Sequence, residues 1–210
     1  MSNESTPHYR VNDTTSYHRE GMKTLGWELT VCNALEDPRS PCRDVLTAPE
    51  SLGNLLFEHL ANCVDMDDID SLVEIGGGYG FVMRDLLSRR AWENAAMIEL
   101  SPVLLARQRE TLYGRDVLFV ENDFFNVGKD FFGRFDLALL NEVVGDFPTL
   151  CDIDPGHLAL PDKKIDALAR EVKRAISRYS LKVPDCPFNL NLGAIRAVER
   201  LCGAGVTCIY

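Results

Sequence analysis

The fold is decided by one stretch, Leu72-Val73-Glu74-Ile75-Gly76-Gly77-Gly78-Tyr79-Gly80. Its first four residues predict a buried strand, and the glycines that follow predict a tight turn. Residues 81–87 come next, and their apolar side chains recur at helical spacing. A strand, a glycine turn and a helix in direct succession form the opening unit of a nucleotide-binding α/β domain.

The glycines of the turn permit positive φ angles and remove side chains that would keep a ligand from the backbone. The helix expected from about Gly80 directs free N–H groups and a partial positive charge at the turn. The dinucleotide fingerprint has glycines at positions one, three and six, but Phe81 is the sixth residue counted from Gly76. Here the glycines stand at positions one, three and five, and Glu74 precedes the first by two residues.

Four further segments have the apolar composition of buried strands. These segments are residues 95–99, 117–121, 135–140 and 205–210. Segments with helical spacing alternate with several of them, so the order of elements predicts an α/β fold: a Rossmann-like parallel sheet with helices on both faces.

Polar residues follow the predicted strands at their carboxyl ends, where ligands bind in open parallel sheets. Glu99 ends the second strand about 20 residues after the glycine turn, the separation at which a carboxylate accepts hydrogen bonds from ribose hydroxyls. Asp123 and Phe124 follow the third strand, and Asn141 and Glu142 follow the fourth. Helix caps, ordinary turns and surface charges are the structural alternatives for these side chains.

The rest of the chain predicts less. Residues 1–48 are rich in polar residues at the start and read as a partly irregular N-terminal arm. Residues 49–210 are expected to form one domain, which begins with a helix over 49–63 capped by Thr47. An amphipathic pattern predicts a long helix over residues 161–182.

Composition narrows the classes of function. A formal net charge of −10 over 210 residues argues against a nucleic-acid binder, because phosphates require clustered Lys and Arg. No apolar run approaches a membrane span, and the first 20 residues lack the apolar core of a signal peptide. We therefore expect a cytoplasmic protein with neither nucleic acid nor membrane as a partner. The seven cysteines include no Cys-x-x-Cys, and the acidic residues 65–70 do not match a calcium loop, so no metal site is predicted.

The pattern acid-x-Gly-x-Gly-x-Gly, which runs from Glu74 to Gly80, resembles motif I of the class I S-adenosylmethionine-dependent methyltransferases. The resemblance covers residues 71–210 and implies S-adenosyl-L-methionine as the cofactor and methyl transfer as the activity. It also implies a role for single residues. Glu74, Gly76, Gly78 and Gly80 would hold the methionine part, Glu99 the ribose, Asp123 and Phe124 the adenine, and Asn141 and Glu142 would face the methyl acceptor.

Within that class, two features look like the MidA-like family. They are the stretch Asn141-Glu142-x5-Pro148 and the late strand over residues 205–210. That family includes complex I assembly proteins that methylate arginine, so a protein side chain such as arginine is one expected acceptor and a small molecule is another. Ile209 stands where the family has an acid, and the glycine that follows in the family is absent here.

Two other functions remain open. The chain could be a dinucleotide-binding oxidoreductase, or a non-catalytic assembly factor that keeps only the S-adenosylmethionine pocket. Two more strands normally follow the fifth strand in this class, so the predicted sheet is incomplete at its C-terminal side. We expect a longer polypeptide, a homo-oligomer or an additional chain to cover this fifth strand, because an uncovered apolar edge promotes aggregation.

Overall fold

The structure is a computed structural model that describes residues 8–19, 30–46 and 50–210. The described residues form two compact units. The larger unit comprises residues 15–143 and 200–210, and the smaller comprises residues 8–14 and 144–199. In this described part of the chain, no helix is long and apolar enough to cross a membrane.

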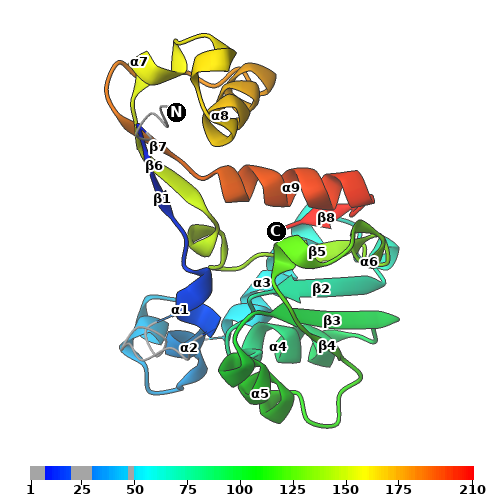
Figure 1. Cartoon of the computed structure of the whole chain (residues 1–210). Helices are drawn as coiled ribbons and strands as arrows, with labels where there is room; N and C mark the ends of the chain where they lie inside the picture. Colours follow the sequence, from blue (N-terminus) through cyan, green and yellow to red (C-terminus); the bar gives the residue numbers. More distant parts are fainter. Residues whose placement is uncertain (1–7, 20–29, 47–49) are drawn as a thin grey trace. The chain divides into compact units, whose positions relative to one another are not determined.

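The larger unit contains a parallel five-stranded sheet in the order β4-β3-β2-β5-β8 (Figure 1). The strands are β2 (Ser71–Ile75), β3 (Asn94–Glu99), β4 (Leu118–Glu121), β5 (Leu137–Leu139) and β8 (Cys208–Ile209). Each of the five predicted strands is present. The first of them, β2, lies at the centre of the sheet, with β3 and β4 on one side and β5 and β8 on the other, so the strand order reverses at β2. The predicted α/β, Rossmann-like sheet flanked by helices is therefore confirmed. Within the described residues, β8 pairs with β5 alone and forms one edge.

The larger unit contains helices α1 to α6 and the last residues of α9, whose residues 192–199 belong to the smaller unit. Their bounds are α1 (Thr15–Arg19), α2 (Val31–Glu36), α3 (Leu52–Cys63), α4 (Phe81–Arg89), α5 (Pro102–Thr111), α6 (Lys129–Phe132) and α9 (Leu192–Ala204). Ser51 caps α3 by accepting a hydrogen bond from the backbone N–H of Asn54. The helix predicted over residues 49–63 thus begins at Leu52, and Thr47, its expected cap, lies outside the described residues.

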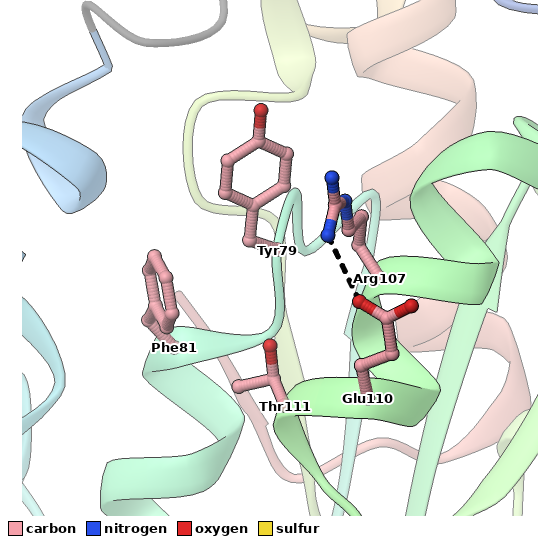
Figure 2. A pocket seen from close by; sticks show the side chains of 5 residues that line it. All are labelled: Tyr79, Phe81, Arg107, Glu110 and Thr111. Atoms are coloured by element: carbon pink, nitrogen blue, oxygen red, sulfur yellow. Dashed lines mark hydrogen bonds and ion pairs between the residues drawn. The ribbon is translucent and has the colours of Figure 1, made fainter.

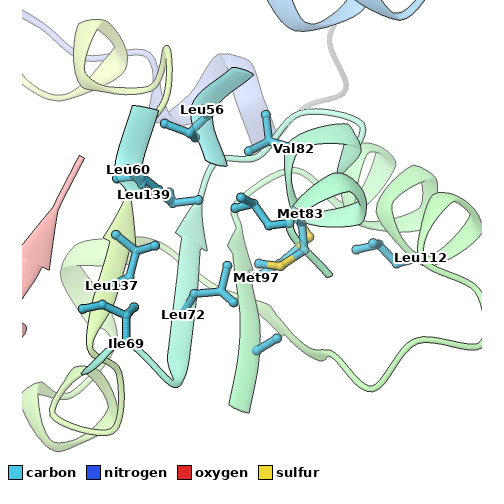
Figure 3. Close-up of a cluster of buried hydrophobic side chains, with 12 residues drawn as sticks. Leu56, Leu60, Ile69, Leu72, Val82, Met83, Met97, Leu112, Leu137 and Leu139 are labelled. Carbon is cyan, nitrogen blue, oxygen red and sulfur yellow. The ribbon is translucent and has the colours of Figure 1, made fainter. Parts of the chain in front are cut away.

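One face of the sheet and two helices share a continuous apolar core, which Figure 3 shows. Side chains alternate between the two faces along a strand, so Leu72 and Met97 point to the same side of neighbouring strands. Leu56 of α3 and Met83 of α4 are buried in this cluster. Gly53 permits the two helices to approach, since a Cβ at this position would lie 2.6 Å from the Cβ of Asp85.

The smaller unit contains an antiparallel three-stranded sheet in the order β1-β6-β7. Its elements are β1 (Arg10–Asn12), β6 (Thr149–Ile153), α7 (Pro155–Leu158), α8 (Ala167–Arg178) and β7 (Phe188–Leu190). Leu150, Ile153 and Val172 belong to a separate apolar core in this unit. The sequence did not predict this sheet, because its strands are short and pair segments that are distant in the chain.

The long helix predicted over residues 161–182 is wrong in its bounds, because α8 spans only Ala167–Arg178. Asp166 starts this helix: one of its carboxylate oxygens accepts hydrogen bonds from the N–H of Ala169 and the hydroxyl of Tyr9. Residues 162–164 form a separate 3-10 turn, and Ile165, which lies between this turn and α8, has an extended backbone.

The two compact units also divide the chain differently from the predicted boundary at residue 48. Residues 8–14 belong with residues 144–199 because β1 pairs with β6, so that Val11 opposes Leu150. Residues 47–49, where the predicted boundary falls, are not among the described residues. The predicted division into an N-terminal arm over residues 1–48 and a methyltransferase domain over residues 49–210 stays a prediction.

Candidate functional site

The glycine turn between β2 and α4 has a backbone that side chains rarely tolerate. Gly76, Gly78 and Gly80 have φ angles of 63°, 55° and 82°, all in the left-handed region. Gly77 is constrained in another way, since a Cβ there would lie 2.5 Å from the methyl carbon of Met97 and 2.7 Å from Oε2 of Glu74. The turn is therefore shaped by backbone, and it leads directly into the first N–H groups of α4.

Glu74 lies beneath this turn, in the central strand. Its side chain is 1% exposed, and its Oε2 atom has no hydrogen-bond partner among the described residues. Burial, followed by the charge of Glu99, raises the pKa of Glu74 to about 8, and the backbone of Met83 opposes the shift. A buried carboxyl without a full set of partners is costly, so this atom is a candidate to interact with a bound ligand.

Glu99 ends the neighbouring strand β3 and is 3% exposed. One carboxylate oxygen accepts a hydrogen bond of 2.9 Å from the N–H of Ser101. The other accepts one of 3.0 Å from Nε2 of Gln108, which also donates to the carbonyl oxygen of Gly78 at 3.0 Å. Burial raises the pKa of Glu99, and these donors act against that shift.

Gln108 was not identified from the sequence. It lies in α5 and is completely buried beside Leu104, Leu105 and Leu112. The signal that could have found it is an uncharged polar residue at a position where the helical pattern requires an apolar one. Its amide connects the glycine turn to the acid that ends β3.

The residues expected beside adenine have local partners in this structure. One carboxylate oxygen of Asp123 accepts a hydrogen bond of 2.8 Å from the N–H of Phe125, as in an ordinary turn. Phe124 is buried, and its ring centroid is 5.1 Å from that of Phe132. The guanidinium of Arg200 lies 5.9 Å from the ring centroid of Phe124. Their contact with adenine stays a prediction.

Asn141 and Glu142 form a turn directly after β5. Glu142 has a φ angle of 56°, which is uncommon for a residue with a side chain and is found at sites where the backbone is constrained. Its exposed carboxylate accepts a hydrogen bond of 3.5 Å from the N–H of Val31. Val143 brings this turn against the glycine turn, since a Cβ at Gly76 would lie 2.5 Å from a methyl carbon of Val143.

The short helix α2 adds one thiol, Cys32, and one further acid, Glu36, to this region. Burial raises the pKa of the Cys32 thiol to about 12, and the charges of Glu74, Asp85, Glu142 and Glu36 add to the shift. The N–H of Val31, at the start of α2, donates a hydrogen bond of 3.5 Å to Glu142, so α2 begins beside the turn that carries this acid.

The guanidinium of Arg84 binds both oxygens of Glu36, at 2.7 and 2.8 Å, and also binds Asp85. Its charge is thereby committed to carboxylates other than Glu74 and Glu142.

A small hollow of about 180 Å³ lies between the glycine turn and the outer side of α5 (Figure 2). It is lined by Tyr79, Phe81, Arg107, Glu110 and Thr111. The two aromatic rings meet edge to face with centroids 6.0 Å apart, and the guanidinium of Arg107 donates to Glu110 at 2.9 Å. The sequence did not single out these residues, and the Arg–Glu pair leaves the hollow without an unbalanced charge.

Metal ligands are not assembled in the described part of the chain, where no group of three or more His, Cys, Asp or Glu is arranged to hold an ion. The acids of the candidate site lie in separate elements instead. Glu74 and Glu99 each end up buried in a strand, and Glu142 projects from a turn.

Comparisons with known proteins find likeness in structure alone. No protein-family model matches the sequence, and no curated protein matches it either. Three solved methyltransferases are similar in structure. The glycopeptide N-methyltransferase MtfA, complexed with sinefungin, has a TM-score of 0.36 and 17% identity over 64% of this chain and 50% of its own. The amino pentose methyltransferase CalS10 of Micromonospora echinaspora, with S-adenosylmethionine bound, has a TM-score of 0.33 and 22% identity over 41% of this chain and 34% of its own.

An S-adenosylmethionine-dependent methyltransferase of Clostridium acetobutylicum has a TM-score of 0.33 and 15% identity over 53% of this chain and 39% of its own. This chain therefore spans half or less of the length of these three solved proteins. Likeness of this extent transfers no substrate or residue role.

Proposed function

We propose that this chain binds S-adenosyl-L-methionine and transfers its methyl group to an acceptor. The observation that carries the proposal is a glycine-rich turn beside two buried carboxyl groups, Glu74 near the end of β2 and Glu99 at the end of the adjacent parallel strand β3. In this proposal the turn would offer backbone to the methionine part, and the carboxylate of Glu99 would accept hydrogen bonds from the ribose hydroxyls.

The charge of the site supports a cationic ligand over a dinucleotide. Burial and the charge of Glu99 raise the pKa of Glu74, and a hydrogen bond from the backbone of Met83 opposes that shift. The ammonium and sulfonium of S-adenosylmethionine would offset the two buried acids, whereas a pyrophosphate would add negative charge beside them. Gly77 leaves room close to Oε2 of Glu74 that any side chain would fill.

When bound, S-adenosylmethionine supplies a methyl group on a sulfonium, from which a neutral thioether is a good leaving group, so the chain need not activate the methyl group covalently. Transfer to a lone pair of the acceptor would leave S-adenosylhomocysteine behind and release one proton from the acceptor. The chain must align the acceptor with that carbon and exclude water. Glu142, whose turn lies beside Gly76, is proposed to orient a cationic or amine acceptor, and Asn141 is proposed to assist it.

The proposed acceptor is a protein side chain such as arginine, in keeping with the resemblance to the MidA-like family. A guanidinium can donate two parallel hydrogen bonds to the carboxylate of Glu142, which would fix the attacking nitrogen. A small-molecule amine or hydroxyl is the alternative acceptor. A partner that covers β8 is proposed on the separate ground that this strand pairs on one side only in the described residues.

Calorimetry with S-adenosylmethionine, S-adenosylhomocysteine and NAD tests the cofactor. We expect both adenosyl ligands to bind and NAD to give no heat; binding of NAD alone would reverse the assignment. Transfer of a tritiated methyl group to cell extract proteins and small molecules then tests catalysis. Ligand binding without transfer to any acceptor fraction would favour a non-catalytic assembly factor.

A further inference from the structure

Gln108 makes the contacts of a connecting residue. Its Nε2 atom donates at 3.0 Å to the carbonyl oxygen of Gly78 and at 3.0 Å to Oε2 of Glu99. The side chain has no exposed surface, and its Oε1 atom has no partner among the described residues. The two acceptors belong to different parts of the candidate site, one to the glycine turn and one to the end of β3.

The amide of Gln108 can take only one orientation here. Both N–H groups of the amide point at acceptor oxygens, and a flipped amide would direct Oε1 at the same two oxygens. A glutamine that donates twice in a dry environment is held firmly, because each lost bond would leave a buried polar atom unsatisfied. Gly80 packs against the same residue, since a Cβ there would lie 3.5 Å from the Cα of Gln108.

Glu99 keeps capacity for another donor in this arrangement. A carboxylate has about four acceptor positions. The N–H of Ser101 and the amide of Gln108 use one oxygen each, and the backbone of Leu100 also donates to this carboxylate. The remaining lone pairs can accept a hydroxyl while Gln108 holds the carboxylate in place. Whether one ligand can contact both the glycine turn and Glu99 therefore depends on where the Glu99 carboxylate lies relative to that turn.

We propose that Gln108 is a positioning residue for the ribose of the cofactor. It holds the carboxylate of Glu99 at a fixed distance from the glycine turn, so that a ligand seated on the turn meets the carboxylate with its ribose hydroxyls. This inference rests on the proposed function, because it requires an adenosyl ligand on the turn.

The test compares two ligands, S-adenosylhomocysteine and its 2′-deoxy analogue, by calorimetry on the full chain. Gln108→Met removes the donor and keeps the length and burial of the side chain. We expect it to weaken S-adenosylhomocysteine about tenfold and the 2′-deoxy analogue about twofold or less, because the analogue lacks a hydroxyl that Glu99 would accept. Leu105→Met, a change of similar shape on the same buried face of α5, should leave both affinities within about twofold.

A double-mutant cycle gives the second readout. In a Glu99→Ala background, Gln108→Met should cost no further affinity, because the residue acts through Glu99. Equal losses for both ligands, an additive cycle or no loss at all would each overturn the positioning role. If thermal melting shows that Gln108→Met does not fold, Gln108→Asn is measured against the same criteria, since its shorter amide cannot keep both bonds. Failure of the proposed function is distinct, because the unmodified chain would then bind neither ligand.

Discussion

Glu99 acts on Glu74 across two adjacent parallel strands: its charge adds to the effect of burial and raises the pKa of Glu74 to about 8. In the free protein Glu74 is therefore largely protonated at neutral pH, which is unusual for a glutamate. A cation bound above it would favour the ionised form and lower that pKa. Cofactor binding and loss of a proton from Glu74 are thereby linked.

The first prediction concerns affinity and pH. Because the cationic ligand prefers ionised Glu74 and the free protein holds the proton below about pH 8, affinity should rise as the pH increases from about 6 to 8 and then level off. Binding at pH 7 should release a proton. Calorimetry of S-adenosylmethionine in buffers of different ionisation enthalpy measures that release. Glu74→Gln should flatten the profile, and an unchanged slope in this variant would contradict the linkage.

The second prediction concerns stability without ligand. Since the folded-state pKa of Glu74 lies above its unfolded value of 4.5, its contribution is fully present below about pH 4.5 and is lost as the pH rises through about 8. Between these values one such group lowers the free energy of unfolding by up to about 1.4 kcal/mol per pH unit. Urea denaturation at several pH values should show that decline. The difference between the native chain and Glu74→Gln isolates it from other groups.

The third prediction tests the ribose contact. Glu99→Ala should weaken S-adenosylmethionine by roughly tenfold or more, because hydrogen bonds to a charged carboxylate contribute about 1.5–3 kcal/mol each. It should also lower stability by about 1–3 kcal/mol, since Ser101 and Gln108 would lose the acceptor of their buried donors. Glu121→Ala is the matched control, as this exposed acid ends the adjoining strand in register with Glu99. Calorimetry that gives both variants the same affinity would remove Glu99 from the ribose site.

The fourth prediction tests the turn. Gly78 has a φ angle of 55°, which a β-branched residue adopts only with strain, so Gly78→Val should abolish cofactor binding and lower the melting temperature. Gly128→Val is the control, because Gly128 has an extended backbone with a φ of −62° and open space at its Cβ position. The two variants are compared by thermal melting with and without S-adenosylmethionine. Normal binding by Gly78→Val would reduce the turn to a structural feature.

The parts of the fold that the sequence predicted are those where local pattern and burial agree. Strand β2 is buried along its whole length and leads into glycines with positive φ, so apolar run and turn chemistry indicate the same unit. The small sheet β1-β6-β7 has no such local signal. Strand β1 has three exposed residues, and its pairing with β6 depends on segments far apart in the chain.

The candidate site was predictable where a residue follows a strand, because sheet topology brings strand ends together. Glu99 was predicted in this way because it ends β3, whereas Glu74 was predicted from its position two residues before the first glycine. The role of each stays a prediction. The contribution of Gln108 and the proximity of Cys32 depend on how α5 and α2 pack, which periodicity does not report. Asp123 accepts a hydrogen bond from the N–H of Phe125. Asn-Asp sequences form such bonds in many ordinary turns, so the sequence could not distinguish this role from contact with adenine.

The last prediction concerns Glu142, whose turn lies beside the glycine turn without being part of it. Its carboxylate is exposed and has one long hydrogen bond, at 3.5 Å from the N–H of Val31, so a bound acceptor could displace that bond at little cost. If Glu142 orients the acceptor, Glu142→Gln should keep S-adenosylmethionine affinity within a few-fold and reduce methyl transfer roughly 100-fold, the scale of a lost acid–base or aligning group.

Glu110→Gln is the control, because this exposed acid lies on α5 and pairs with Arg107 instead. Cofactor affinity and turnover are measured on the same preparations, so that loss of binding is separated from loss of chemistry. The left-handed backbone of Glu142 adds a second readout: Glu142→Gly should relieve strain and raise the free energy of unfolding by up to about 1 kcal/mol while losing activity. A gain in stability together with a loss of turnover indicates a residue retained for function. Full turnover in Glu142→Gln would instead exclude its carboxylate from the acceptor site.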